Sequence, residues 1–105
     1  MTPYRVVLVT VSSSKEARRI ATALVKEKIV ACANIIPGLR SLYRWKGKVE
    51  KASEELLLLK TKRSKMKNLT RRVRELHSYT VPEIIALPVA QGSGKYLRWI
   101  QNSLK

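Results

Sequence analysis

The sequence contains no aspartate, one histidine (His77) and one cysteine (Cys32) among its 105 residues. A Ser-His-Asp triad is therefore excluded, and one chain cannot assemble a four-ligand structural zinc site. A lone cysteine also excludes an internal disulfide. The patterns CxxC, HExxH, GxxxxGK[ST] and the EF-hand loop are absent as well. A Cys32–His77 pair is the one nucleophile–base combination left, and we expect those residues to lie apart, in a strand and at a helix end. We predict that the protein is not an enzyme.

Long apolar runs are also missing. No stretch of about 18 apolar residues is present, so no membrane-spanning segment is expected and a membrane is not among the predicted partners. No signal-peptide pattern precedes the first predicted strand, because Met1-Thr2-Pro3 leads directly into it. We expect a cytoplasmic protein in which Cys32 is a buried, small apolar residue.

Negatively charged residues are scarce. Lysine and arginine number 22 against 7 acidic residues, all of them glutamate, and the formal net charge is +15. A basic nucleic-acid-binding module is one hypothesis, and a soluble surface that is merely basic is the alternative. The predicted basic helix faces carry no aromatic residues that could stack on bases, which favours nonspecific attraction to nucleic acid or other anionic surfaces.

A long hairpin over residues 29–61 dominates the chain. Two apolar arms flank the Lys46-Gly47 turn, and Pro37-Gly38 interrupts the first arm, which predicts a bulge or sharp bend there. The tip, residues 39–48, should project from the body and expose Leu42, Tyr43 and Trp45. An exposed apolar ribbon of this kind needs a partner to cover it.

The other predicted elements complete a single domain over residues 1–105. Tyr4–Val11 is nearly all apolar and predicts a central strand. Ser13 and Glu16 fit a capping box before a helix whose apolar face holds Ala17, Ile20, Ala21, Leu24 and Val25. A second helix is predicted over 62–77 with Met66, Leu69, Val73 and Leu76 facing the core, then an edge strand over 83–89, and a last helix from Lys95 that buries Tyr96, Leu97 and Ile100.

This order of elements, βαββαβ plus a C-terminal helix, predicts an α+β, ferredoxin-like fold with an antiparallel sheet. Four polar or aromatic residues need an explanation within it: Lys60 and Glu83 at strand ends, and Tyr43 and Trp45 on the hairpin. One interpretation is a structural Lys60–Glu83 ion pair beside aromatic packing. The other is a cleft at a subunit boundary, lined by these four residues.

Several separated motifs stand out along the chain: VACANIIPG at 30–38, SLYRWKGK at 41–48, LKT at 59–61, ELHSYTVPEIIALPV at 75–89 and YLRWI at 96–100. In order and spacing they resemble the divalent-cation-tolerance (CutA) family. The resemblance spans nearly the whole chain. It implies a ferredoxin-like subunit in a tight homotrimer similar to that of PII signalling proteins, with hairpins that pair between subunits and small-ligand clefts between them.

The resemblance implies a non-enzymatic role in tolerance of copper and other divalent cations. It makes His77 the candidate metal ligand, and Tyr43, Trp45, Lys60 and Glu83 the lining of the inter-subunit cleft. A PII-like signalling trimer that binds a small molecule is the alternative. Three departures weaken a copper site: Leu76 replaces a second histidine, Val9 a cysteine, and Ser78 the usual proline.

The basic exterior is the other departure from the family. The family motifs are kept, whereas the predicted outer faces of the helices are almost uniformly cationic. This combination is typical of a protein whose surface charge has been engineered. We therefore carry forward the hypothesis of a surface-charge-altered member, with a naturally basic member as its rival.

Overall fold

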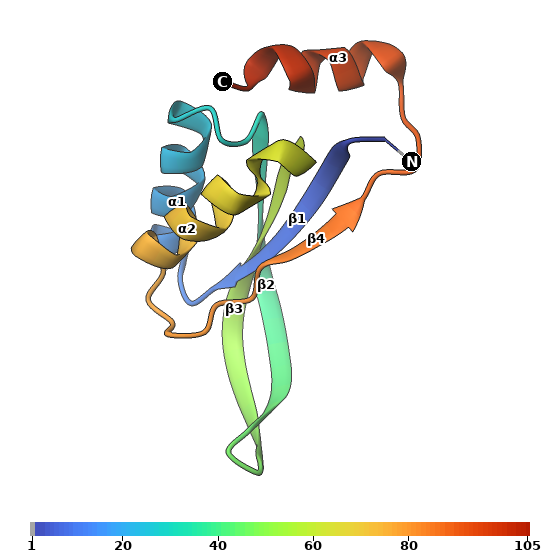
Figure 1. Ribbon diagram of the computed structural model, residues 1–105. Helices are drawn as coiled ribbons and strands as arrows, with labels where there is room; N and C mark the ends of the chain where they lie inside the picture. Colours follow the sequence, from blue (N-terminus) through green and yellow to red (C-terminus); the bar gives the residue numbers. More distant parts are fainter. Residues whose placement is uncertain (1) are drawn as a thin grey trace.

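A computed structural model describes residues 2–105 (Figure 1). Its element order is β1 (Tyr4–Val11), α1 (Ser14–Lys26), β2 (Cys32–Trp45), β3 (Lys48–Lys62), a 3-10 turn (Arg63–Lys65), α2 (Met66–Leu76), β4 (Ile85–Pro88) and α3 (Gly94–Ser103). The four strands form one antiparallel sheet in the order β2-β3-β1-β4. The predicted ferredoxin-like fold is confirmed, and so are the central place of β1 and the edge position of β4.

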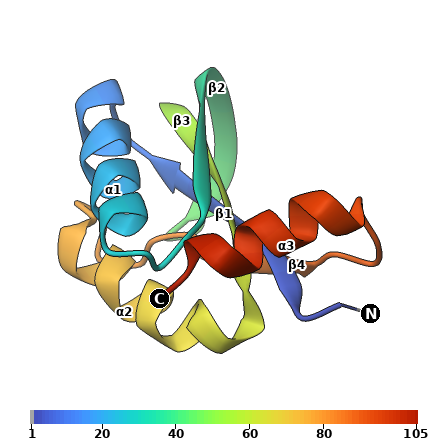
Figure 2. The same ribbon diagram turned by 90° about the horizontal axis from the view of Figure 1, so that it is seen from above.

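The core lies between one face of the sheet and the helices α1 and α2. Side chains alternate across a strand, so every second residue of β1 and β3 points toward the helices. Those residues and the apolar stripes of both helices are buried. The buried set is Val7, Val9, Val11, Leu57, Leu59, Ala17, Ile20, Ala21, Leu24, Leu69 and Val73. Figures 1 and 2 show α1 and α2 side by side on this face, whereas α3 crosses one end of the sheet.

The start of α1 differs in one detail from a standard capping box. Ser13 is the N-cap and its hydroxyl accepts from the Glu16 N–H at 3.1 Å, as predicted. The Glu16 carboxylate, however, accepts from the N–H of Ser12 and not from that of Ser13. The carboxylate lies inside the body at this position, and Glu16 is only 4% exposed.

The long hairpin is built as its turn and bulge residues predicted. Gly38 has φ +77°, and the β2–β3 register shifts between Ile36 and Leu39. At the tip, Lys46 (φ +51°) and Gly47 (φ +78°) connect Trp45 to its partner Lys48. Positive φ at both central residues is the geometry of a two-residue hairpin turn that follows the strand twist. The tip therefore projects well beyond the body (Figure 1).

Five expectations about individual elements or residues are wrong. The second helix begins at Met66 after a 3-10 turn, and β4 covers only Ile85–Pro88. Val25 on α1 and Tyr96 on α3 are each 42% exposed, although both were assigned to the core. Cys32 is only partly buried, because the face of β2 on which it lies has no covering helix.

Candidate functional site

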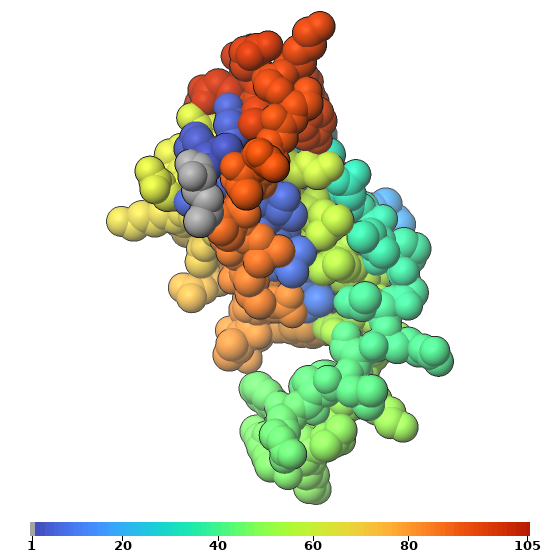
Figure 3. Space-filling view, turned by 90° about the vertical axis from the view of Figure 1, so that its right-hand side faces the viewer, coloured from blue at the N-terminus to red at the C-terminus, as the bar shows by residue number. Residues whose placement is uncertain are grey.

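The sheet face opposite α1 and α2 is uncovered over most of its area (Figure 3). The register places Leu8 between Leu58 and Ile85, and Val6 between Lys60 and Leu87, so two rows of side chains run across three strands. We call this surface the open sheet face. Its apolar members are Val6, Leu8, Ile36, Leu56, Leu58, Ile85 and Leu87. Ile36, Ile85 and Leu87 are 40–48% exposed, and a contiguous apolar area of this kind marks an interaction surface.

The hairpin tip extends this apolar surface. Leu42 is 69% exposed, Val49 65%, Trp45 49% and Tyr43 45%. The tip lies beyond the helices and the strands β1 and β4 (Figure 1). Exposed aromatic residues on a long two-stranded ribbon need a covering partner to be shielded from water.

The four predicted cleft residues are not brought together in one chain. Tyr43 and Trp45 lie near the tip, whereas Lys60 lies at the opposite end of β3. Glu83 precedes β4, whose Ile85 pairs with Leu8, so Glu83 is displaced along the sheet from Lys60 toward the hairpin. No Lys60–Glu83 ion pair exists within residues 2–105. The structural ion pair considered from the sequence is therefore wrong, and the cleft between subunits stays a prediction.

Lys60 has a different neighbour. Its Nζ lies 5.6 Å from the centre of the Tyr96 ring, a cation–π contact that joins β3 to α3. The Tyr96 ring in turn packs against Trp99 at 5.5 Å between centroids. The aromatic residues of α3 thus border the open sheet face at the end remote from the hairpin.

His77 is buried and both of its ring nitrogens are engaged. Nε2 lies 2.7 Å from the carbonyl oxygen of Thr10, and Nδ1 accepts from the N–H of Tyr79 at 3.0 Å. This pattern requires the neutral tautomer that is protonated on Nε2. The ring therefore bridges the end of β1 to the loop after α2. Its position explains a structural role, while its role as a metal ligand stays a prediction.

Next to His77 lies a buried carboxylate. Glu16 accepts from the N–H and hydroxyl of Ser12 through Oε1, at 3.1 and 2.8 Å, and from the N–H of Ser78 through Oε2 at 2.6 Å. Burial by itself raises the pKa of Glu16, but the hydrogen bonds from Ser78 and Ser12 outweigh it and lower the pKa to about 2. The carboxylate is ionised at neutral pH and holds the loops after β1 and after α2 together.

A second polar contact joins the same loop to the hairpin. The Tyr79 hydroxyl donates to Glu54 Oε2 at 2.7 Å, and burial together with this carboxylate raises the pKa of Tyr79. Beside it lies a hollow of about 330 Å³, lined by Ser12, Ser13, Gly38, Leu39, Arg40, Ser53, Glu54 and Glu55. The buried Oε1 of Glu55 has no hydrogen-bond partner in the described chain. This polar region was not predicted; only the Ser-Ser-x-x-Glu spacing pointed toward it.

Within residues 2–105 the donor set does not fit a metal ion. No three His, Cys, Asp or Glu side chains lie close enough to hold one. Cys32 contacts Asn34, whereas His77 contacts Thr10 and Tyr79, so these two candidates do not meet. A metal held by protein side chains usually needs three or four ligands, which a single chain does not provide.

Comparison with known proteins assigns the family. The model of the CutA1 divalent ion tolerance protein family matches residues 5–103. The chain belongs to this family. The divalent-cation tolerance protein CutA of Thermus thermophilus is 53% identical over 98 residues, which are 93% of this chain and 95% of that protein. The resemblance noted from the sequence motifs is thereby confirmed.

CutA proteins of other organisms and a solved CutA structure agree. The chloroplastic Protein CutA of Arabidopsis thaliana is 48% identical over 103 residues, 98% of this chain, although the chain spans only 57% of that protein. The solved structure of the Thermus thermophilus protein has a TM-score of 0.96 at 51% identity and covers 97% of this chain and 99% of its own. None of the helices formed by residues 2–105 is long and apolar enough to cross a membrane.

Proposed function

We propose that this CutA1 chain acts as a non-enzymatic, homotrimeric divalent-cation tolerance protein of the cytoplasm. The family match over residues 5–103 carries the proposal, and the relative from Thermus thermophilus, which covers 93% of the chain, bears the name of a divalent-cation tolerance protein. The absence of an aspartate and the engagement of both nitrogens of the single histidine argue against a catalytic centre.

The open sheet face supports the trimer. Its apolar rows and the hairpin tip together leave Ile36, Ile85, Leu87, Leu42 and Trp45 between 40% and 69% exposed. Burying apolar area stabilises an assembly by about 25 cal/mol per Å². A closed ring of three copies would cover both surfaces, whereas the opposite side of the sheet is already filled by α1 and α2.

The bound cation is proposed to be copper or another divalent ion held between subunits. One chain offers no trio of ligands, but a symmetric trimer presents each donor three times. The same boundary is the proposed cleft, in which Tyr43 and Trp45 of one hairpin approach Lys60 or Glu83 of a neighbouring copy.

Paired glutamate substitutions at positions of equal exposure test the assembly and the cation site together. Ile36 on the open sheet face is 40% exposed and Val25 on α1 is 42% exposed. In size-exclusion chromatography with light scattering, wild type and Val25→Glu should give three times the 12.0 kDa chain mass. Ile36→Glu should give a smaller species, because it places three charges in one interface.

Calorimetric titration of the same three proteins with Cu²⁺ then tests the site. Copper should bind wild type and Val25→Glu and bind Ile36→Glu at least tenfold more weakly. Equal binding to Ile36→Glu in a monomeric state would overturn the site between subunits, and a wild-type monomer would overturn the trimer.

A second property is proposed from the charge. The chain carries a formal +15, which attracts anionic surfaces and the phosphate backbone of nucleic acid without regard to sequence. This attraction needs no stacking residues and should weaken steeply as salt rises.

A further inference from the structure

The outer surface of the helices α1 and α2 carries charge of mainly one sign, which is positive. Both helices use their apolar stripes in the core, so their polar faces point to solvent on the side opposite the open sheet face (Figures 1 and 2). We call this outer surface, with the 3-10 turn, the helical face. Its cationic residues are Lys15, Arg18, Arg19, Lys26, Arg63, Lys65, Lys67, Arg71, Arg72 and Arg74.

Few of these charges are neutralised. Glu16 is buried below the surface, and the exposed carboxylates are Glu27 and Glu75. Arg72 binds both of them, at 2.9 and 3.3 Å, and Arg71 shares Glu75 at 2.9 Å. Arg19 also lies 3.9 Å from the buried Glu16 carboxylate, and Lys65 donates to an oxygen of the C-terminal Lys105. Within residues 2–105 no ion pair engages the remaining cations of this face, which are Lys15, Arg18, Lys26, Arg63, Lys67 and Arg74. The helical face therefore keeps most of its positive charge for a partner.

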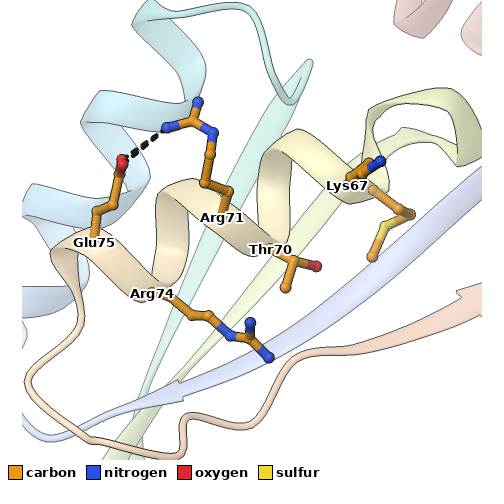
Figure 4. A pocket seen from close by; sticks show the side chains of 6 residues that line it. Lys67, Thr70, Arg71, Arg74 and Glu75 are labelled. Carbon is orange, nitrogen blue, oxygen red and sulfur yellow. Dashed lines mark hydrogen bonds and ion pairs between the residues drawn. The ribbon is translucent and has the colours of Figure 1, made fainter.

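A row of cations on α2 borders an open hollow of about 690 Å³ (Figure 4). Lys67, Arg71 and Arg74 follow i, i+4, i+7 spacing, which puts them on one side of the helix over about 10 Å of its axis. The side chains of Met66, Thr70 and Glu75 line the same hollow. The Glu75 carboxylate pairs with Arg71 at 2.9 Å, whereas Arg74 extends away from Arg71 (Figure 4). The row offers several separated guanidinium and ammonium donors along a line.

The chemistry of this face selects among anionic partners. The sequences of α1, the 3-10 turn and α2 hold no aromatic residue, so single-stranded bases have nothing to stack on. The apolar stripes of both helices are packed in the core, so neither helix presents an apolar face that could insert into a bilayer. Double-stranded DNA carries one negative charge per about 1.7 Å of axis and exposes phosphates rather than bases. A line of cations that includes guanidinium groups suits that backbone.

We infer that the helical face binds the phosphate backbone of double-stranded nucleic acid, with Lys67, Arg71 and Arg74 as its central contacts. The inference rests on the proposed attraction to polyanions and assigns that attraction to one surface and one form of nucleic acid. If the open sheet face closes a trimer, all three helical faces point outward and one assembly presents three such surfaces.

Fluorescence anisotropy with a labelled 20-base-pair DNA duplex, measured from about 50 to 200 mM salt, tests the inference. The variant Lys67→Gln/Arg71→Gln/Arg74→Gln removes three charges from the helical face. The control Lys46→Gln/Lys48→Gln/Lys51→Gln removes three exposed charges from the hairpin. The α2 variant should bind at least tenfold more weakly, and the steepness of log K against log salt should fall by about 2 to 3. The control should reduce the affinity and the steepness much less.

The other outcomes are separable. Equal weakening by both triple variants would show that total charge alone attracts DNA, which overturns the assigned surface but leaves the attraction to polyanions. Equal or tighter binding of the single strand, or of anionic phospholipid vesicles, would overturn the preference for a duplex. No binding of wild type to any of these probes at about 50 mM salt would overturn the attraction itself. Circular dichroism of each variant establishes that it is folded.

Discussion

Glu16 shows how one residue can join distant parts of this chain. Its carboxylate accepts hydrogen bonds from Ser12, four residues away, and from Ser78, 62 residues away. The helix start at Ser13 could be predicted, because serine before a helix and glutamate three residues on are a known cap, although that cap would place the carboxylate on the N–H of Ser13 and not of Ser12. The contact with Ser78 could not be predicted, since no periodicity relates Ser78 to Glu16. The same reason hid the contact of His77 with Thr10.

The lowered pKa of Glu16 makes stability depend on acid. Its pKa falls from an ordinary 4.5 to about 2 in the folded chain, so its contribution is complete above about pH 5 and is lost as the pH falls toward 2. Each pKa unit corresponds to about 1.4 kcal/mol, so this group should account for about 3 kcal/mol of the loss. Guanidinium unfolding of wild type at pH 7, 4 and 2.5 measures it.

Glu16→Gln is the variant for that comparison. It should lower the free energy of unfolding at pH 7 by about 2 kcal/mol, because an amide replaces a charged acceptor, and it should flatten the acid-induced loss. The control is Glu75→Gln at a largely exposed site on α2, which should keep the wild-type pH profile. A Glu16→Gln profile parallel to wild type would contradict the assignment.

At the scale of elements, the hairpin was the most predictable part. Its turn, its bulge at Pro37-Gly38 and its projecting tip all followed from residues with special backbone preferences. The failures were of another kind. Val25 and Tyr96 continue apolar stripes yet lie exposed, because a stripe indicates which side of a helix is apolar and not how far the covering layer extends.

The hairpin turn carries local strain that a substitution can relieve. Lys46 adopts φ +51°, which costs a residue with a Cβ about 1 kcal/mol and suits asparagine better. Lys46→Asn should raise the free energy of unfolding by about 0.5 kcal/mol, as measured by the guanidinium midpoint. Lys48→Asn removes the same charge from the neighbouring strand residue and should give no gain. A larger gain from Lys48→Asn would mean that charge, and not backbone conformation, decides the effect.

At the scale of the whole molecule, charge opposes the proposed assembly. The sequence established the excess of +15 per chain, and the structure added where it gathers: on the helical face, away from the open sheet face. Neither the trimer nor its cleft follows from one chain, because the four predicted cleft residues are not brought together within it. Whether the basic exterior was engineered also stays a prediction.

Three chains would bring about +45 together, so the proposed trimer should be more stable in moderate salt. Raising NaCl from about 10 to 150 mM shortens the screening length from about 30 to 8 Å, which weakens repulsion among the exposed cations. The thermal midpoint should rise by several degrees over this range. Lys67→Gln/Arg71→Gln/Arg74→Gln, which removes nine charges per trimer, should show a smaller rise. A midpoint that falls with salt would contradict self-repulsion as the dominant effect.

The two tryptophans lie near opposite ends of the molecule, Trp45 on the hairpin at 49% exposure and Trp99 on α3 at 47%. An indole ring that is partly exposed to water emits at longer wavelengths than a buried one, so each tryptophan reports on its own surroundings. With Trp99 replaced by phenylalanine, the remaining emission comes from the hairpin alone. The emission wavelength would then shorten when another copy covers the hairpin, and no added label would be needed to detect it.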